Sequence, residues 1–284
     1  MSILLADSGS TKTDWVVIDN GKVVADYKTI GFNPYFQTTE QIYDELILNL
    51  KPFISEHLSS VEKLYYYGAG CSNEINCKIV GDGIKAALDL QEVKIGHDLL
   101  AAARALCGSD SGIACILGTG SNSCLYNGVD VAENVPSYGY MFGDDGSGAH
   151  IGKTLVQAYF NDELPVKIKT AFEAKGYHRE EILDNVYKKG MPSRYLASIN
   201  SFVSDNIKEP YMKKLVKQCF VDFFHKQIEK YTDSRKYTVH SVGSIGYYYK
   251  TILAEVANEE GYKLGKVIKS PIEGLIEFHN KKTD

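Results

Sequence analysis

Two turns rich in glycine and hydroxyl side chains are the segments of this chain best suited to hold phosphate. One covers residues 8–13 and the other residues 118–122, and each follows a short apolar segment. Glycine lets the backbone approach a ligand closely, while hydroxyl and backbone N–H groups bind phosphate oxygens. Either turn alone could be a plain hairpin turn, but two such turns could clasp one triphosphate. The candidate phosphate ligands are Gly9, Ser10, Thr11, Lys12, Thr13, Gly118, Thr119 and Gly120.

Two carboxylates lie where they could act on a bound nucleotide. Asp7 ends the first apolar segment, where it could hold a water molecule of Mg²⁺ or bond its own turn. Asp98 follows a predicted strand at 92–96 and precedes a predicted helix at 99–106. Ligands collect beyond the carboxyl ends of parallel strands, so Asp98 is a candidate general base. From the residues alone, a helix N-cap is the favoured role for Asp98.

Three further segments could contact a ligand. The glycine-rich loop at 138–148 carries two acidic residues, a composition found at sugar and metal sites and also in flexible connections. Asn33 could reach a ligand hydroxyl or form a turn before Pro34. The turn that begins with Gly243 and Ser244 could admit an adenine or ribose close to the backbone.

The elements that position these residues follow a pattern that occurs twice. In each block a strand, a small polar turn, a strand, an Asn-Gly pair and a strand succeed one another, which predicts a duplicated domain. Later strands alternate with helices, which predicts parallel crossovers. Strands are predicted at 3–7, 14–19, 22–29, 63–67, 92–96, 113–117, 123–126, 129–132, 237–242 and 263–269. Helices are predicted at 39–58, 73–90, 99–106, 150–160, 163–175, 179–189, 193–206, 210–232 and from residue 270 onward.

Composition excludes several other classes of protein. The 284 residues suffice for two domains, and a hydrophobic content of 44% indicates a folded globular chain. Lys and Arg total 31 against 36 Asp and Glu without a polybasic run, so no nucleic-acid or membrane-surface footprint is present. A basic leader and a spanning apolar segment are both missing, which predicts a cytoplasmic protein. The six cysteines lack a C-x-x-C pair and are expected to be buried, reduced thiols. The tyrosine runs at 65–67 and 247–249 are interpreted as packing residues.

The motifs occur in the order found in the actin, Hsp70 and sugar-kinase superfamily. Residues 7–13 resemble its first phosphate motif, residues 118–122 its second, and residues 241–244 its adenosine motif. Residues 139–147 (GYMFGDDGS) are similar to the Gly-Tyr-x-x-Gly-Asp-Glu-Gly-Ser motif of N-acetylglucosamine kinases and the related BadF/BadG/BcrA/BcrD ATPases. The resemblance covers nearly the whole chain.

This resemblance implies an α/β fold of duplicated actin-like (ribonuclease H-like) domains. Each would be a mixed five-stranded sheet flanked by helices, with a cleft between the two domains. The smaller domain is expected to comprise residues 1–108 and a helix at 270–284, and the larger domain residues 109–269.

The resemblance also implies roles for individual residues. Asp98 matches the catalytic aspartate, which overturns the preference for a simple cap, and Asp7 matches the carboxylate near the metal. Thr11 and Thr119 match ATP contacts, so ATP and Mg²⁺ are the expected cofactors. The positions expected to contact the sugar are Asn33, Ser121, Asn122 and Asp144, with Gly143 beside them. Pro34-Tyr35 follows Asn33 where the vertebrate enzymes carry His-Trp, a departure at the sugar site.

The expected activity is therefore transfer of the γ-phosphate of MgATP to the 6-hydroxyl of N-acetylglucosamine, with Asp98 as general base. The family also implies a homodimer. One alternative is a kinase for N-acetylmuramic acid or another amino sugar. A second is a BadF-type activator ATPase, which needs cysteines for an iron–sulfur cluster, and Cys124 has no matching partner motif. A third is a non-catalytic nucleotide or sugar sensor.

Overall fold

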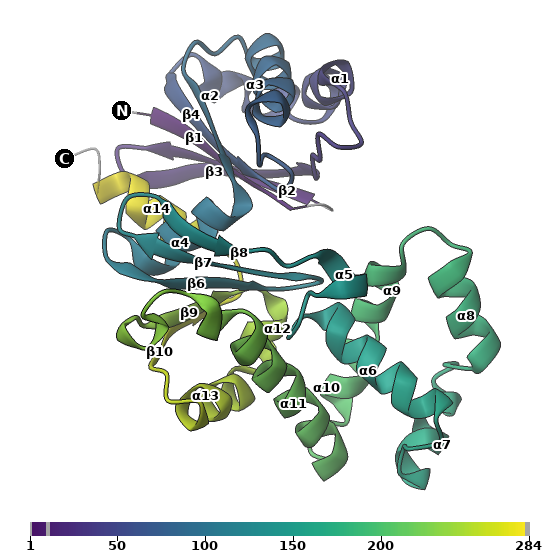
Figure 1. Ribbon diagram of the computed structural model, residues 1–284. Helices are drawn as coiled ribbons and strands as arrows, with labels where there is room; N and C mark the ends of the chain where they lie inside the picture. The colour runs from purple at the N-terminus through teal and green to yellow at the C-terminus, as the bar shows by residue number, and fades with distance from the viewer. Residues whose placement is uncertain (1, 10–11, 282–284) are drawn as a thin grey trace. The chain divides into compact units, whose positions relative to one another are not determined.

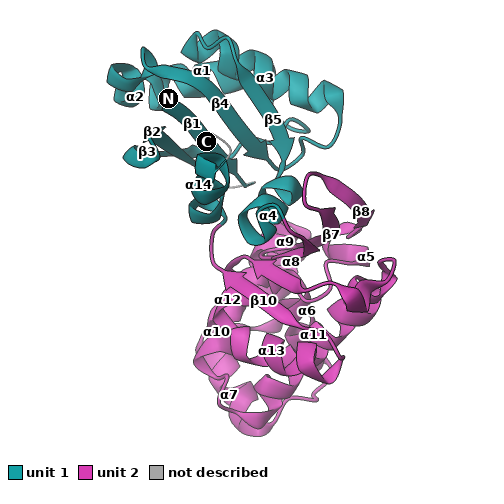
Figure 2. Cartoon of the chain, turned by 90° about the vertical axis from the view of Figure 1, so that its left-hand side faces the viewer, with its two compact units in different colours: residues 1–109, 271–284 teal, residues 110–270 magenta. Residues whose placement is uncertain are grey.

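The chain divides into two compact units, shown in different colours in Figure 2. The computed structural model describes residues 2–9 and 12–281. Unit 1 comprises residues 1–109 and 271–284, and unit 2 comprises residues 110–270. The sequence-based boundaries were 108/109 and 269/270.

Unit 1 is built on a mixed five-stranded sheet with the strand order β3-β2-β1-β4-β5 (Figure 1). β2 is antiparallel to β1 and β3, while β4 is parallel to β1 and β5. Helices α1 to α3 lie on one side of the sheet, and α4 and α14 on the other. The strands are β1 (Ser2–Ser8), β2 (Lys12–Asp19), β3 (Lys22–Ile30), β4 (Val61–Gly68) and β5 (Val93–His97). The helices are α1 (Thr39–Asn49), α2 (Lys51–Leu58), α3 (Glu74–Leu88), α4 (Asp98–Cys107) and α14 (Ile272–Lys281).

Unit 2 repeats this sheet strand for strand. Its order is β10-β9-β6-β7-β8, with β6 to β10 in the places of β1 to β5 and with the same pattern of antiparallel and parallel pairs. The predicted duplicated α/β fold is thereby confirmed. The strands are β6 (Ser111–Leu117), β7 (Ser121–Asn127), β8 (Val131–Val135), β9 (Val239–Val242) and β10 (Leu264–Ile268). The helices are α5 (Gly139–Phe142), α6 (Gly148–Phe160), α7 (Val166–Ala174), α8 (Arg179–Tyr187), α9 (Pro192–Ser198), α10 (Asn200–Asp205), α11 (Pro210–Lys226), α12 (Ser244–Tyr248) and α13 (Lys250–Glu259), with 3₁₀ turns at 228–230 and 234–236.

Local chemistry explains most element boundaries. Thr38 begins α1 with a capping box, since its hydroxyl accepts the Gln41 N–H while the Gln41 side chain accepts the Thr38 N–H. The single helix predicted at 39–58 is wrong, because the chain bends at Leu50 and Pro52 starts a second helix. The helix predicted at 193–206 is divided at Ile199 into α9 and α10, and the helix predicted at 210–232 ends at Lys226.

The two Asn-Gly hairpins differ. Asn20 and Gly21 have φ values of 47° and 77°, as the predicted type I′ turn requires. Asn127 instead caps a longer turn, because its Oδ1 accepts the N–H groups of Val129 and Asp130. The strand predicted at 129–132 therefore begins later, at Val131.

Each unit has its own hydrophobic core. In unit 1, Trp15 and Phe32 pack edge to face in the core between the sheet and helices α1 to α3, and Tyr66 stacks on Phe32. In unit 2 a larger cluster fills the space between the sheet and the long helices, including Phe172, Phe220 and Phe224. Five cysteines are buried, and Cys77 is half-buried. None of the helices in the described part of the chain has the length and apolar character needed to cross a bilayer.

Candidate functional site

The first phosphate turn joins β1 to β2 and is closed by a hydrogen bond from the Gly9 N–H to the Lys12 carbonyl at 3.0 Å. The Ser8 and Thr13 hydroxyls lie 2.8 Å apart, and the Thr13 hydroxyl donates to the Ile30 carbonyl at 2.9 Å. Thr13 is thus buried and anchors the turn to β3. Ser10 and Thr11, the other predicted hydroxyl ligands, lie outside the described residues.

Three carboxylates gather beside this turn in unit 1. Asp7 lies opposite Asp14 in the β1–β2 ladder, and Lys12 forms an ion pair with Asp14 at 2.6 Å. Burial, followed by the charges of Asp14 and Asp98, raises the pKa of Asp7 to about 7, and the charge of Lys12 opposes this rise. Among the described residues, Lys12 is the cation that acts on Asp7, so the described part of this group carries more negative than positive charge. Oxygen donors of this kind fit Mg²⁺, which favours oxygen ligands and often binds through water.

Asp98 is the first residue of α4, directly after β5 ends at His97. The capping role expected for Asp98 from the bare sequence belongs to His97, whose Nδ1 accepts the Leu100 N–H at 3.1 Å. The Leu99 N–H donates to Oδ1 of Asp98 at 2.9 Å and orients the carboxyl group. Burial raises the pKa of Asp98, which makes its carboxylate a stronger base than an exposed aspartate.

Asn33 forms the turn after β3. Its Oδ1 accepts the Tyr35 N–H at 3.1 Å, and its own N–H donates to the Gln37 side chain at 2.7 Å. Gly70 lies so close that a Cβ there would be 2.9 Å from this Oδ1. The Asn33 side chain is therefore held by its oxygen, while its Nδ2 makes no hydrogen bond to any described residue.

The second phosphate turn, between β6 and β7, is held by the start of α6. The Gly118 N–H donates to the Gly120 carbonyl at 3.0 Å. The Gly148 N–H donates to the Gly118 carbonyl at 2.8 Å, and the Ala149 N–H donates to the Thr119 carbonyl at 3.0 Å. Helix α6 thereby uses two N–H groups that its own first turn cannot satisfy to fix the turn.

Asp144 closes on the same turn from the glycine-rich loop. It has a φ of 52° and is 8% exposed, and its Oδ1 accepts the Ser121 N–H at 3.2 Å. Burial raises the pKa of Asp144. The Ser121 hydroxyl is buried without a hydrogen-bond partner in the described part of the chain, which is uncommon for a buried polar atom. Gly143 and Asn122 flank this pair. Asn122 uses its Oδ1 to accept from Ser123 and Asn134.

A charged cluster that sequence analysis missed supports the glycine-rich loop. Lys226 of α11 forms an ion pair with the buried Asp145 at 2.9 Å, and His150 Nδ1 accepts the Gly146 N–H at 3.1 Å. His150 Nε2 lies 3.9 Å from carboxylate oxygens of Asp145 and Asp222. Burial nevertheless lowers the pKa of His150, so the ring tends to be neutral and its Nδ1 can accept. The spacing of four residues between Gly146 and His150 was a weak signal for their local hydrogen bond. Nothing in the sequence pointed to the ion pair with Lys226.

The adenosine motif lies against the second phosphate turn. Gly243 has a φ of 120°, and a Cβ there would lie 2.3 Å from the carbonyl oxygen of Leu117 at the end of β6. Ser244 then begins α12. Unit 2 therefore brings together the turn at 118–122, the loop at 143–147 and Gly243 with Ser244. Unit 1 brings together Asp7, Gly9, Lys12, Thr13 and Asp98.

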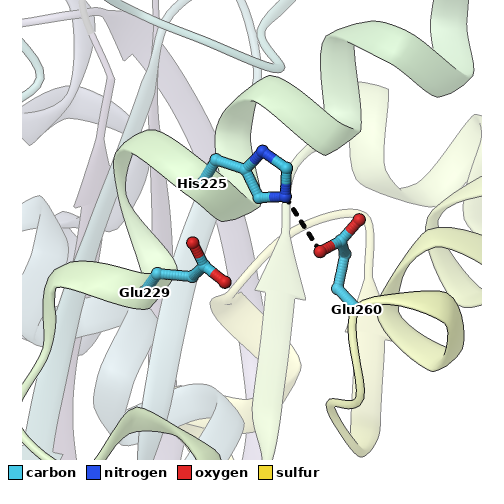
Figure 3. A group of neighbouring side chains, drawn as sticks. All are labelled: His225, Glu229 and Glu260. Atoms are coloured by element: carbon cyan, nitrogen blue, oxygen red, sulfur yellow. Dashed lines mark hydrogen bonds and ion pairs between the residues drawn. The ribbon is translucent and has the colours of Figure 1, made fainter.

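In the described part of the chain, one group of three side chains could ligate a metal ion directly. His225, Glu229 and Glu260 lie on the surface of unit 2 with their ligand atoms within 4.8 Å of one another (Figure 3). The His225 Nε2 and Glu260 Oε2 atoms are 2.9 Å apart, and Glu229 is paired with Arg235 at 2.9 Å. Because Arg235 already neutralises one carboxylate, we interpret this group as a largely exposed ion-pair network of unit 2.

Comparison with solved structures shows the family of the chain. A candidate N-acetylglucosamine kinase from Porphyromonas gingivalis is 36% identical over 99% of this chain and 100% of that one, with a TM-score of 0.94. A second candidate from Chromobacterium violaceum is 16% identical, with 98% of each chain covered and a TM-score of 0.67. The ROK hexokinase from Thermus thermophilus is 14% identical over 98% of this chain and 96% of its own, with a TM-score of 0.54. The last two likenesses show the fold alone.

No protein-family model and no curated protein matches the sequence. The evidence of family is therefore the 36% identity over the whole length of the Porphyromonas structure, together with the repeated sheet and the two phosphate turns. On that evidence the chain belongs to the family of N-acetylglucosamine kinases and BadF/BadG/BcrA/BcrD-type ATPases, within the actin–Hsp70–sugar kinase superfamily.

Proposed function

We propose that the protein is a sugar kinase that transfers the γ-phosphoryl group of MgATP to the 6-hydroxyl of N-acetylglucosamine. The observation that carries this proposal is the placement of Asp98 at the end of β5, in the unit that also carries Asp7 and the first phosphate turn. In the reaction, a bond forms between the sugar O6 and the γ-phosphorus, and the bond from that phosphorus to the bridging oxygen of ADP breaks. The hydroxyl proton passes to Asp98.

Phosphate binding falls to the two turns. Their backbone N–H groups and the Lys12 ammonium group would hold the β- and γ-phosphates, with hydroxyls of Ser10, Thr11 and Thr119 as further donors. Mg²⁺, when bound, supplies positive charge against the phosphate oxygens. Asp7 would hold the ion through a water molecule, and its raised pKa is consistent with a carboxylate that lacks a cation partner of its own.

Sugar binding falls to polar groups of the glycine-rich loop and the adjoining strand in unit 2, and to Asn33 in unit 1. The buried hydroxyl of Ser121 has no hydrogen-bond partner among the described residues, and Asn33 has an amide group to offer to a sugar hydroxyl. Asp144 fixes the Ser121 backbone and supplies an acceptor, and Gly143 and Asn122 border it. A partly satisfied set of donors and acceptors suits a ligand with several hydroxyl groups.

The activator-ATPase alternative meets a physical objection. Cys124, the cysteine nearest the second turn, is fully buried in the middle of β7 and pairs with Ala114 of β6. A cluster ligand at an interface between subunits must reach the surface, and Cys124 does not.

The test is ADP release from MgATP by purified protein with one sugar at a time. The panel contains N-acetylglucosamine, N-acetylmannosamine, N-acetylmuramic acid, glucosamine, glucose and no sugar. We expect stimulation chiefly by N-acetylglucosamine, with phosphorus–proton coupling in the product NMR spectrum locating the ester on O6. A preference for another sugar would keep the kinase and change its substrate. Hydrolysis independent of sugar, or no ADP release at all, would contradict the proposal.

A further inference from the structure

Unit 1 contains a cavity of about 420 Å³ on the side of its sheet that carries α4 and α14. None of the described residues assigned above to nucleotide, metal or sugar lines it. The volume lies within the range of small-molecule sites and suits a ligand of monosaccharide size. Its principal polar and aromatic side chains are Tyr65, Tyr67, Lys94, Arg104, Phe278 and His279.

The strand register creates the aromatic wall of this cavity. Tyr65 pairs with Lys94 and Tyr67 pairs with Gly96, so the two tyrosines share one face of the sheet while Tyr66 is buried in the core on the other. Gly96 leaves space beside the Tyr67 ring, because a Cβ there would lie 3.0 Å from that ring. Two residues of the 65–67 tyrosine run thus have a role besides core packing.

Arg104 provides an incompletely satisfied cation in this cavity. Its guanidinium group lies over the rings of Tyr67 and Phe278, at 5.7 and 5.2 Å from their centroids. Its Nη1 donates to the Tyr67 hydroxyl at 2.7 Å, and that hydroxyl contacts His279 Nε2 at 2.9 Å. The Arg104 Nε is buried without a hydrogen-bond partner in the described part of the chain. A buried guanidinium N–H without an acceptor indicates a place for one.

Lys94 adds a second positive charge at the same cavity. Its Nζ lies 5.9 Å from the Tyr65 ring centroid and 3.6 Å from a carboxylate oxygen of Glu92. Glu92 is already bound at 2.8 Å by Lys63, so one carboxylate serves two lysines. In the described part of the chain Arg104 has no carboxylate partner within 4 Å. The cavity therefore has an excess of positive charge.

We propose that this cavity binds a small phosphate monoester. Arg104 and Lys94 would bind the phosphate, since a guanidinium group matches the geometry of phosphate oxygens and two cations match a dianion. The Tyr65 and Phe278 rings would contact the organic part. Gly96 and Leu100, which line the cavity, lie two residues on either side of Asp98. A ligand bound in the cavity would therefore constrain the segment that presents Asp98. This regulatory link rests on the proposed function, whereas the proposal of a phosphate-binding site does not.

The test is calorimetric titration of the full chain, without nucleotide, with glucose 6-phosphate, inorganic phosphate, glucose and citrate. We expect the two phosphates to bind, the ester more tightly, and glucose not to bind. Arg104→Gln should weaken ester binding by at least about tenfold, and Lys94→Gln by about threefold or more. The exposed Lys78→Gln on α3 is the matched control, and Lys12→Gln tests the phosphate turn. Both of these variants should bind the ester like the unchanged protein.

Three outcomes would overturn the site. The first is that the ester does not bind at about 10 mM. The second is that neither Arg104→Gln nor Lys94→Gln weakens ester binding. The third is that Lys12→Gln abolishes ester binding, which would locate the phosphate on the first phosphate turn. Binding of citrate without either phosphate would overturn the assignment of the ligand. Should Arg104→Gln fail to fold, Lys94→Gln decides, because the Lys94 side chain is 59% exposed. Neither turnover nor ATP enters the measurement, so its failure and that of the kinase proposal are distinguishable.

Discussion

The two phosphate turns occupy the same place in sheets of the same topology, yet different groups surround them. The first is bordered by the carboxylates of Asp7, Asp14 and Asp98. The second is bordered by backbone groups of α6 and by Asp144, whose carboxylate already accepts the Ser121 N–H. The two units share the backbone topology, but the charge of the side chains around their phosphate turns differs. The groups around the first turn can take up a proton or a cation, whereas the groups around the second turn fix the conformation of its backbone.

The two central glycines show the same difference in steric terms. Among the described residues, a Cβ on Gly9 would meet the Lys12 carbonyl alone, at 3.9 Å, which is ordinary contact. A Cβ on Gly120 would lie 2.8 Å from Asp144 Oδ2. With respect to the described residues, a Cβ therefore has room at Gly9, whereas a Cβ at Gly120 would be too close to Asp144.

The largest expected effect comes from a substitution in unit 1, beside the first phosphate turn. Asp98→Asn should lower kcat by about 10²–10⁴-fold, since general-base catalysis contributes that much, with little change in KM. Steady-state kinetics measure the loss, and circular dichroism checks the fold. In the unchanged protein kcat should fall as pH falls through the raised pKa of Asp98, because the protonated carboxyl cannot accept a proton. Asp82→Asn, exposed on α3, is the control. Near-normal turnover of Asp98→Asn would remove Asp98 from the mechanism.

An intermediate effect should separate the two turns. Gly120→Ala should push Asp144 away from Ser121, lowering the free energy of unfolding by about 1–3 kcal/mol and raising the sugar KM. Gly9→Ala should leave unfolding nearly unchanged, because its Cβ has room. Urea unfolding of both variants, with KM values for ATP and sugar, provides the comparison. Equal losses of stability would show that the first turn is as tightly fitted as the second.

The third expected effect is on the stability of the metal-free protein, and it depends on pH. The pKa of Asp7 is raised to about 7 in the folded protein, above its unfolded value, so folding is favoured at low pH and this contribution is lost as pH rises from about 4 to 7. Asp7→Asn should therefore stabilise the metal-free protein by about 1–3 kcal/mol at pH 8 and hardly at all at pH 4. Thermal unfolding at both pH values tests this. Destabilisation at pH 8 would mean that the carboxylate is paired in the fold.

The fold was largely predictable because its signals are local. Alternating apolar segments, the Asn-Gly pair at 20–21 and the repeated small polar turns predicted the doubled sheet. The errors arose where side chains change a local rule. Leu50 is not a helix-breaking residue, so the bend at this position depends on Pro52, two positions later. Asn127 was interpreted as a two-residue turn, but its side chain caps two N–H groups and lengthens the loop.

The site was predictable as a set of motifs but not as a set of contacts. The glycine-rich loop could be found from its composition, whereas the ion pair of Lys226 with Asp145 joins residues 81 positions apart. His97 was passed over as a helix cap because histidine is not a preferred capping residue, and Asp98 beside it is one. Long-range pairing and competition between adjacent residues are decided by packing, which a single sequence does not display.

Helix α14 bears on how the chain is made. It packs on α4, the helix that begins with Asp98, so closely that a Cβ on Gly274 would lie 2.5 Å from the Ala105 carbonyl. Unit 1 is thus interrupted by the whole of unit 2 along the chain. During translation, residues 110–270 leave the ribosome before the segment that contains α14. Unit 2 can therefore fold while unit 1 still lacks this helix. A chain halted before residue 271 leaves α4 uncovered, which makes it a target for chaperones and proteases.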